Sequence, residues 1–234
     1  MINRASGTAI ERRDIRIAPV GLAGELRIPA PSKSIVAFAH GSGSSRLSPR
    51  NRAVAEALNR HGVATLLFDL LTIEEEDDRA NVFDIPLLAE RLIQAVHWLD
   101  REPAIAGLPL GLFGASTGAA AALVAAARLG ERVGAVVSRG GRPDLAGAAL
   151  DRIRVPTLLI VGGNDLPVID LNQQALARLH GPKALEIVPG ASHLFPERGA
   201  LEAVIDHAAR WFERYLVSNG AAGSTHAQGA HRRS

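Results

Sequence analysis

Ser116 lies between two glycines, in a setting that suits a nucleophile. Residues 114–118 read GASTG, a G-x-S-x-G pattern that follows an apolar run and precedes a run of alanines. This order predicts a strand, a sharp turn and a helix, and Gly114 and Gly118 leave room for the turn. The turn would hold the Ser116 hydroxyl at the carboxyl edge of a sheet and at a helix N-terminus, where negative charge is favoured.

A serine at neutral pH needs a base to remove its proton, and the base needs an acid to orient it. We predict His193 as the base and Asp165 as the acid. Asp165 follows the apolar run 157–163, and His193 follows the apolar run 184–189, so both come just after expected strands. The chain order Ser–Asp–His is the order expected for such a triad on this architecture. Asp144 is the alternative acid, but we interpret it as an N-terminal residue of a helix.

A glycine-containing segment, AHGSGSSRLSPRN (39–51), follows another expected strand. Gly41 and Gly43 allow the backbone to turn so that its amide groups point into the site. We predict that the backbone N–H groups of Thr117 and Ser42 form an oxyanion hole, with Gly41 or Gly43 as alternatives to Ser42. His40 and Asp69 each come at the end of an expected strand, and we interpret both as structural.

The elements that must position these residues alternate along the chain. Residues 13–30 read as a β-hairpin, and apolar runs such as SIVAFAH (34–40) are typical of strands buried on both faces. Helical spacing is clearest over 85–99 and over 201–215. The alternation predicts one α/β domain over residues 1–217, with a mostly parallel sheet of about eight strands and helices on both faces. The small, polar residues 218–234 are expected to be disordered.

Composition excludes several classes of protein. The 234 residues include no cysteine, so there is no disulfide and no cysteine nucleophile. The formal net charge is only +2, and the arginines are scattered, so we expect no nucleic-acid partner. We expect no membrane association, because no apolar run approaches the ~18 residues of a membrane span. The first residues lack the apolar core of a signal peptide, so a cytoplasmic location is expected.

We expect no metal. No pair of histidines has the spacing of metal ligands, and the acidic run EEEDD (74–78) is interpreted as a solvated loop. A homo-oligomer is compatible with the sequence.

Five segments resemble the α/β-hydrolase superfamily and, within it, the dienelactone hydrolase family. They are AHGSGSSRLSPRN, GLFGASTGAAAAL, VVSRGGRPDLAG, TLLIVGGND and VPGASHLF. The stretches HGSGSSRLSPRN and SRGGRPDL resemble a bacterial subgroup of hydrolases that is sometimes fused to phosphoribosyltransferase domains. We expect no such domain in this chain.

The resemblance implies an α/β-hydrolase fold that hydrolyses a small-molecule ester or lactone through an acyl-enzyme, with no cofactor. The connection between residues 138 and 157 is short, so no large cap domain is expected there. The namesake enzymes use a cysteine nucleophile, and Ser116 in its place favours a carboxylesterase-type reaction. Because those enzymes hold their substrate with arginines, Arg46 and Arg139 are candidates for substrate contact. Thioester hydrolysis, acyl transfer, and a non-catalytic receptor for small molecules are the alternatives.

Overall fold

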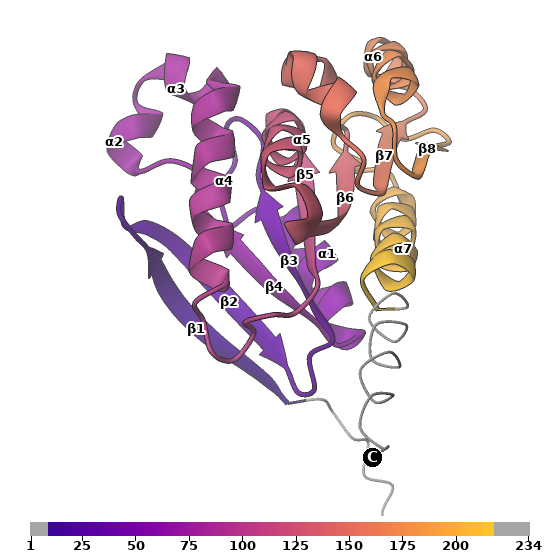
Figure 1. Cartoon of the computed structure of the whole chain (residues 1–234). Coiled ribbons are helices and arrows are strands. Elements are labelled where there is room, and N and C mark those ends of the chain that lie inside the picture. The colour runs from indigo at the N-terminus through magenta and orange to yellow at the C-terminus, as the bar shows by residue number, and fades with distance from the viewer. Residues whose placement is uncertain (1–8, 218–234) are drawn as a thin grey trace, which may run out of the picture.

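An eight-stranded sheet forms the centre of the computed structural model, which describes residues 9–217 (Figure 1). The strand order is β1-β2-β4-β3-β5-β6-β7-β8. The pairs β1–β2 and β2–β4 are antiparallel and the other pairs are parallel, which confirms the predicted mostly parallel sheet with a hairpin at one edge. The strands are β1 (Ile10–Ile17), β2 (Leu22–Pro29), β3 (Ser34–Ala39), β4 (Val63–Phe68), β5 (Leu110–Ala115), β6 (Val133–Arg139), β7 (Thr157–Gly162) and β8 (Lys183–Val188).

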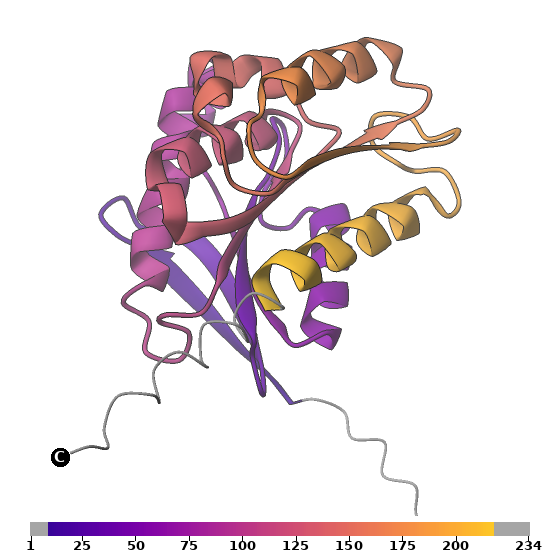
Figure 2. The ribbon, with the colours of Figure 1, turned by 45° about the vertical axis from the view of Figure 1, so that its right-hand side comes forward.

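Helices cover both faces of the sheet, as predicted (Figures 1 and 2). One face carries α4 (Ile85–Leu99), α5 (Thr117–Leu129), the 3-10 helix η2 (Pro143–Arg152) and α6 (Leu166–Arg178). The other carries α1 (Pro49–Arg60) and α7 (Ala200–Phe212), which continues into the π-helical turn η3 (Glu213–Val217). Short elements complete the set: α2 (Ile73–Glu76), α3 (Arg79–Phe83) and η1 (Gly130–Arg132). In the described range η2 alone joins β6 to β7, and no large cap stands there.

The predicted solvated loop at 74–78 is wrong in part, because residues 73–76 form the helix α2. Thr72 caps this helix, and Glu75 returns a hydrogen bond to the Thr72 backbone, which makes a capping box. Thr72 and Glu75 stand three positions apart, which is the sequence signature of such a box. Figure 1 shows α2 and α3 beside one end of α4.

Two expectations about the ends of the chain are not tested. The predicted disordered tail, 218–234, lies outside the described residues, and the domain limit at residue 217 stays a prediction.

Between residues 9 and 217, no helix has both the length and the apolar character needed to cross a membrane.

The alanines of α5 explain how this helix approaches the sheet so closely. Ala119, Ala120, Ala121 and Ala122 are fully buried. A Cβ atom on Gly118 would lie 2.3 Å from the carbonyl oxygens of Ala39, the last residue of β3, and of His40, which follows it. The first turn of α5 is therefore in contact with the backbone at the end of β3.

We expect Gly118→Ala to lower the free energy of unfolding by about 3 kcal/mol, because backbone atoms at 2.3 Å must move to admit the methyl group. The comparison variant is Gly107→Ala. Gly107 has φ +80° and open space around its Cβ position, so its cost is backbone strain alone, about 1 kcal/mol. Urea denaturation followed by circular dichroism measures both values. Equal losses in the two variants would contradict the steric explanation.

Candidate active site

Ser116 has an unusual backbone conformation at the junction of β5 and α5. Its φ is 51° and its ψ is −121°, a backbone conformation that residues other than glycine rarely adopt. Its N–H donates to the Arg139 carbonyl at 3.2 Å, and its own carbonyl accepts from the N–H groups of Ala119 and Arg142. These bonds hold the residue in a strained turn, and strain of this kind concentrates at functional sites.

His193 and Asp165 form a close pair at the same edge of the sheet. His193 Nδ1 lies 2.6 Å from Asp165 Oδ2, although the two residues are 28 positions apart in the sequence. The loops that carry them are joined, because the Asn164 N–H donates to the Ala191 carbonyl at 2.9 Å. With Nδ1 facing the carboxylate, Nε2 is the ring nitrogen left to exchange a proton with a reacting group.

The His193 ring approaches the turn that holds Ser116. A Cβ atom on Gly140 would lie 3.6 Å from His193 Cε1, and Gly140 directly follows Arg139, whose carbonyl accepts from Ser116. Within residues 9–217 no hydrogen bond joins Ser116 Oγ to His193. Catalytic hydrogen bonds often form only when substrate is bound. The role of Ser116 as nucleophile stays a prediction.

The two predicted oxyanion donors are neighbours in space. The Ser42 N–H donates to Thr117 Oγ1 at 2.9 Å, so in this structure the Thr117 hydroxyl occupies the Ser42 donor. The Thr117 N–H begins α5 and has no acceptor among the described residues. A substrate oxygen would have to replace the Thr117 hydroxyl at Ser42, and the role of Ser42 stays a prediction.

His40 fixes the start of the loop that carries Ser42. Its Nδ1 donates to the Gly41 carbonyl at 3.0 Å, and its Nε2 accepts from the Leu70 N–H at 3.0 Å. Burial lowers the pKa of His40 below its usual range, so the ring is neutral. His40 therefore links the segment after β3 to the segment after β4, which confirms its interpretation as structural.

A cavity of about 390 Å³ opens beside Ser42 and Thr117. It is lined by His40, Gly41, Ser42, Gly43, Ser44, Ser45, Leu70, Leu71, Glu76, Val82, Leu88 and Thr117. Its apolar side chains come from the segment after β4, from α3 and from α4, and Glu76 is the one carboxylate in this lining. Sequence reasoning missed Val82 and Glu76, because nothing in their spacing indicates that α2 and α3 face the site.

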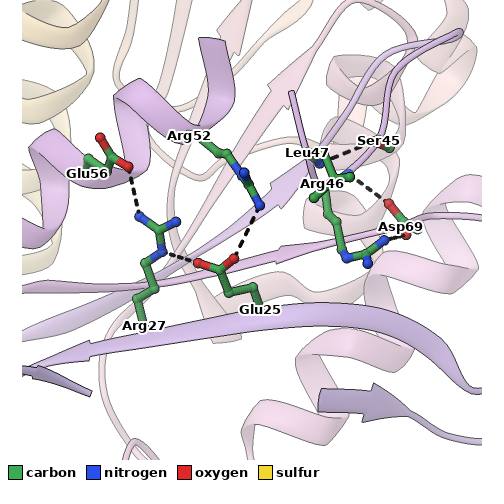
Figure 3. A network of polar contacts seen from close by, with 8 residues as sticks. All are labelled: Glu25, Arg27, Ser45, Arg46, Leu47, Arg52, Glu56 and Asp69. Carbon is green, nitrogen blue, oxygen red and sulfur yellow. Dashed lines mark hydrogen bonds and ion pairs between the residues drawn. The ribbon is translucent and has the colours of Figure 1, made fainter. Parts of the chain in front are cut away.

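The remaining candidates have mostly structural partners. Arg46 forms an ion pair with Asp69, and its backbone N–H donates to the same carboxylate at 2.7 Å (Figure 3). Asp69 is thus structural, as predicted. Asp144 lies in the first turn of η2 and binds Arg142 through both carboxylate oxygens, which confirms that it is a helix N-terminal residue. Arg139 is buried at the end of β6. Contact of Arg46 or Arg139 with substrate stays a prediction.

No group of three or more histidine, aspartate or glutamate side chains is arranged to hold a metal ion in residues 9–217.

Comparisons with known proteins agree with this fold. The model of a family described as "Alpha/beta hydrolase domain" matches residues 32–210. The crystal structure of a dienelactone hydrolase from Anabaena variabilis ATCC 29413 has 56% sequence identity and a TM-score of 0.85. The match covers 89% of this chain and 99% of that chain. Est1E from Butyrivibrio proteoclasticus has 16% identity and a TM-score of 0.73, over 87% of this chain and 98% of its own, and it supports the fold alone.

Two Mycobacterium tuberculosis proteins, from strains CDC 1551 / Oshkosh and ATCC 25618 / H37Rv, are each 55% identical over 224 residues. Each is called "Putative phosphoribosyl transferase". The match covers 95% of this chain but 51% of each relative, so the chain spans about half their length. The family model and the dienelactone hydrolase structure together show that this chain belongs to the α/β-hydrolase family and is a dienelactone hydrolase-like hydrolase.

Proposed function

We propose that the chain is a serine hydrolase that cleaves a carboxylic ester or lactone of a small molecule through an acyl-enzyme. The observation that carries this proposal is the His193–Asp165 pair beside the strained turn at Ser116. Neither residue of the pair is near Ser116 in sequence. A partly buried carboxylate, an imidazole and a serine held at φ 51° are the parts that nucleophilic acyl transfer needs.

In the proposed reaction Ser116 Oγ attacks the ester carbonyl while His193 Nε2 takes the hydroxyl proton. The Asp165 carboxylate stabilises the imidazolium, and the N–H groups of Thr117 and Ser42 stabilise the oxyanion. The intermediate then collapses, and the alcohol leaves with the proton from His193. Water, activated by His193, attacks the acyl-enzyme, releases the acid and restores the Ser116 hydroxyl.

The cavity beside Ser42 bears on the size and polarity of the substrate. Leu71 from the segment after β4, Val82 from α3 and Leu88 from α4 give it an apolar wall. Its volume of about 390 Å³ falls in the range of small-molecule sites. Glu76 is the one charged residue of its lining. We propose that an uncharged, apolar part of the substrate occupies this cavity.

The longer relatives are named as phosphoribosyl transferases, and this name does not contradict a hydrolase activity of the present chain. The hydrolase model matches residues 32–210, which is most of the chain. We therefore assign any phosphoribosyl transfer by those relatives to the half of their length that this chain does not cover.

The direct test is a fluorophosphonate probe, which forms a covalent bond with activated serines. We expect labelling of the purified protein, with the adduct on the peptide that contains Ser116 by mass spectrometry. A parallel panel of p-nitrophenyl esters of increasing acyl length should be hydrolysed. Absence of both labelling and turnover in a folded sample would refute the proposal and favour a small-molecule receptor.

A further inference from the structure

Residues 139–142, with the sequence RGGR, run from the end of β6 to the start of η2 and hold the backbone of Ser116 from both sides. The Arg139 carbonyl accepts from the Ser116 N–H at 3.2 Å, and the Arg142 N–H donates to the Ser116 carbonyl at 3.2 Å. We call residues 139–142 the RGGR segment. It belongs to the stretch SRGGRPDL, to which the proposed reaction gives no role.

The RGGR segment also contacts His193. A Cβ atom on Gly140 would lie 3.0 Å from the His193 carbonyl oxygen and 3.6 Å from His193 Cε1, so the Gly140 backbone packs against both the main chain and the ring. Gly140 has φ +50°, and its N–H donates to the Ile160 carbonyl of β7 at 2.7 Å. Two of the three residues predicted to be catalytic therefore lie against one short segment.

Asp165, the third of these residues, is connected to the RGGR segment through the helix that it begins. Asp165 is the N-cap of α6, and Asn172 lies about two turns along that helix. The Asn172 side-chain NH₂ group donates to the Gly141 carbonyl at 3.0 Å and to the Val168 carbonyl, in the first turn of α6, at 2.7 Å. Between residues 9 and 217, the bond to Gly141 is the one hydrogen bond that joins α6 to the RGGR segment.

Asn172 is an amide on an otherwise apolar, buried face of its helix. It is fully buried, and the other buried residues of α6 are Val168 and Ala175. Its Oδ1 is buried and has no donor among the described residues. A buried amide with an unpaired oxygen costs free energy that an apolar side chain would not cost. Packing alone therefore does not explain this residue, whereas the bond to Gly141 gives it a role.

We infer that Asn172 is a positioning residue, which keeps α6 in a fixed place relative to the turn that holds Ser116. The inference rests on the proposed function. The effect of Asn172 passes through Gly141 and the rest of the RGGR segment, which holds Ser116. Without this bond, α6 and the Asp165 carboxylate that binds His193 can shift relative to Ser116. A displacement of about 1 Å between reacting groups can lower a rate by about 100-fold.

Asn59 offers a matched control at the opposite edge of the sheet. It is 1% exposed, and its NH₂ group donates to the Val63 carbonyl at 2.9 Å and to Thr65 Oγ1 at 3.1 Å. Its Oδ1 is also buried without a donor among the described residues. These bonds join the last turn of α1 to the start of β4, whereas Ser116 follows the carboxyl end of β5, which is parallel to β4. The two asparagines thus share their burial and bonding and lie at opposite edges of the sheet.

The first test compares Asn172→Leu with Asn59→Leu. Each change keeps the approximate size of the side chain and removes its hydrogen bonds, so both variants should lose similar stability in urea denaturation. We expect Asn172→Leu to lower kcat for a p-nitrophenyl ester by about 30-fold, with KM within about twofold of the wild-type value. Asn59→Leu should keep kcat within about threefold of the wild type. Equal kcat values in the two variants would overturn the inference.

Asn172→Asp keeps the shape of the side chain and removes both donors, and it provides a second test should Asn172→Leu fail to fold. Burial of a carboxyl group raises its pKa, and the protonated group can again donate one hydrogen bond to Gly141. The kcat of this variant, divided by the wild-type kcat at the same pH, should therefore rise as the pH falls from about 8 to about 6. The division removes the titration of His193, which both proteins share. The same ratio for Asn59→Asp should stay constant, and a constant ratio for Asn172→Asp would contradict the positioning role.

Proton NMR separates this inference from the proposed function, because it requires no turnover. The proton between His193 Nδ1 and Asp165 Oδ2, which lie 2.6 Å apart, should resonate at low field. We expect Asn172→Leu to shift or broaden this resonance and Asn59→Leu to leave it unchanged. Ester turnover with an unchanged resonance and an unchanged kcat in Asn172→Leu would refute the positioning role and leave the esterase standing. A shifted resonance in a chain that hydrolyses no ester would refute the proposed function and support the link between α6 and the RGGR segment.

Discussion

Ser116→Ala is expected to lower kcat for ester hydrolysis by about 10⁵-fold or more and to abolish fluorophosphonate labelling. The methyl group cannot attack a carbonyl, and the residual rate over water would come from the oxyanion donors and from binding. The fold should survive, because the hydrogen bonds that hold residue 116 use only its backbone N–H and carbonyl. Stopped-flow and steady-state assays with a p-nitrophenyl ester measure the loss.

The control for this variant is Ser32→Ala, which changes a hydroxyl in the loop between β2 and β3 whose acceptor is the Pro29 carbonyl. Its kcat should equal that of the wild type within twofold. Circular dichroism of both variants excludes unfolding. If Ser116→Ala retained more than about one hundredth of the wild-type kcat, the nucleophile would be elsewhere.

Asp165→Asn is expected to lower kcat by about 10⁴-fold with little change in stability. The carboxylate at 2.6 Å from His193 Nδ1 keeps the proton on that nitrogen and leaves Nε2 free to act as the base. The amide of the Asp165→Asn variant can place its NH₂ group toward His193 Nδ1. The ring would then carry its proton on Nε2, and Nε2 could no longer accept the proton of Ser116. The measurement is kcat with a p-nitrophenyl ester across pH, since the effect is on chemistry rather than on substrate affinity.

Asp144→Asn is the matched comparison, because Asp144 is the alternative acid on sequence grounds. Its carboxylate binds Arg142 at 2.9 and 2.7 Å, so we expect a loss of kcat below tenfold. Should Asp144→Asn prove more damaging than Asp165→Asn, the pairing of His193 with Asp165 would not be the catalytic one.

The sequence alone predicted the mostly parallel sheet, because β3 to β7 are buried on both faces and read as continuous apolar runs. It also predicted where Ser116, Asp165 and His193 would lie relative to the strands. In a parallel sheet all carboxyl ends meet at one edge, so residues that follow successive strands are brought together whatever their separation in sequence. Local pattern and topology together thus determine the position of the candidate site.

The tertiary structure decided how side chains at that edge are paired. Thr117 accepts from Ser42 only because β3 and β5 are neighbours in register, which no local pattern states. Val82 and Glu76 reach the cavity because α3 packs against α4 and α2 packs against α3. The sequence does not distinguish the surroundings of Arg27 from those of Arg139. In the folded chain Arg27 pairs with Glu25 and Glu56. Arg139 instead lies against Asn51 and near Arg50. Charge pairing and cavity lining depend on contacts between residues distant in sequence, and only the folded chain fixes those contacts.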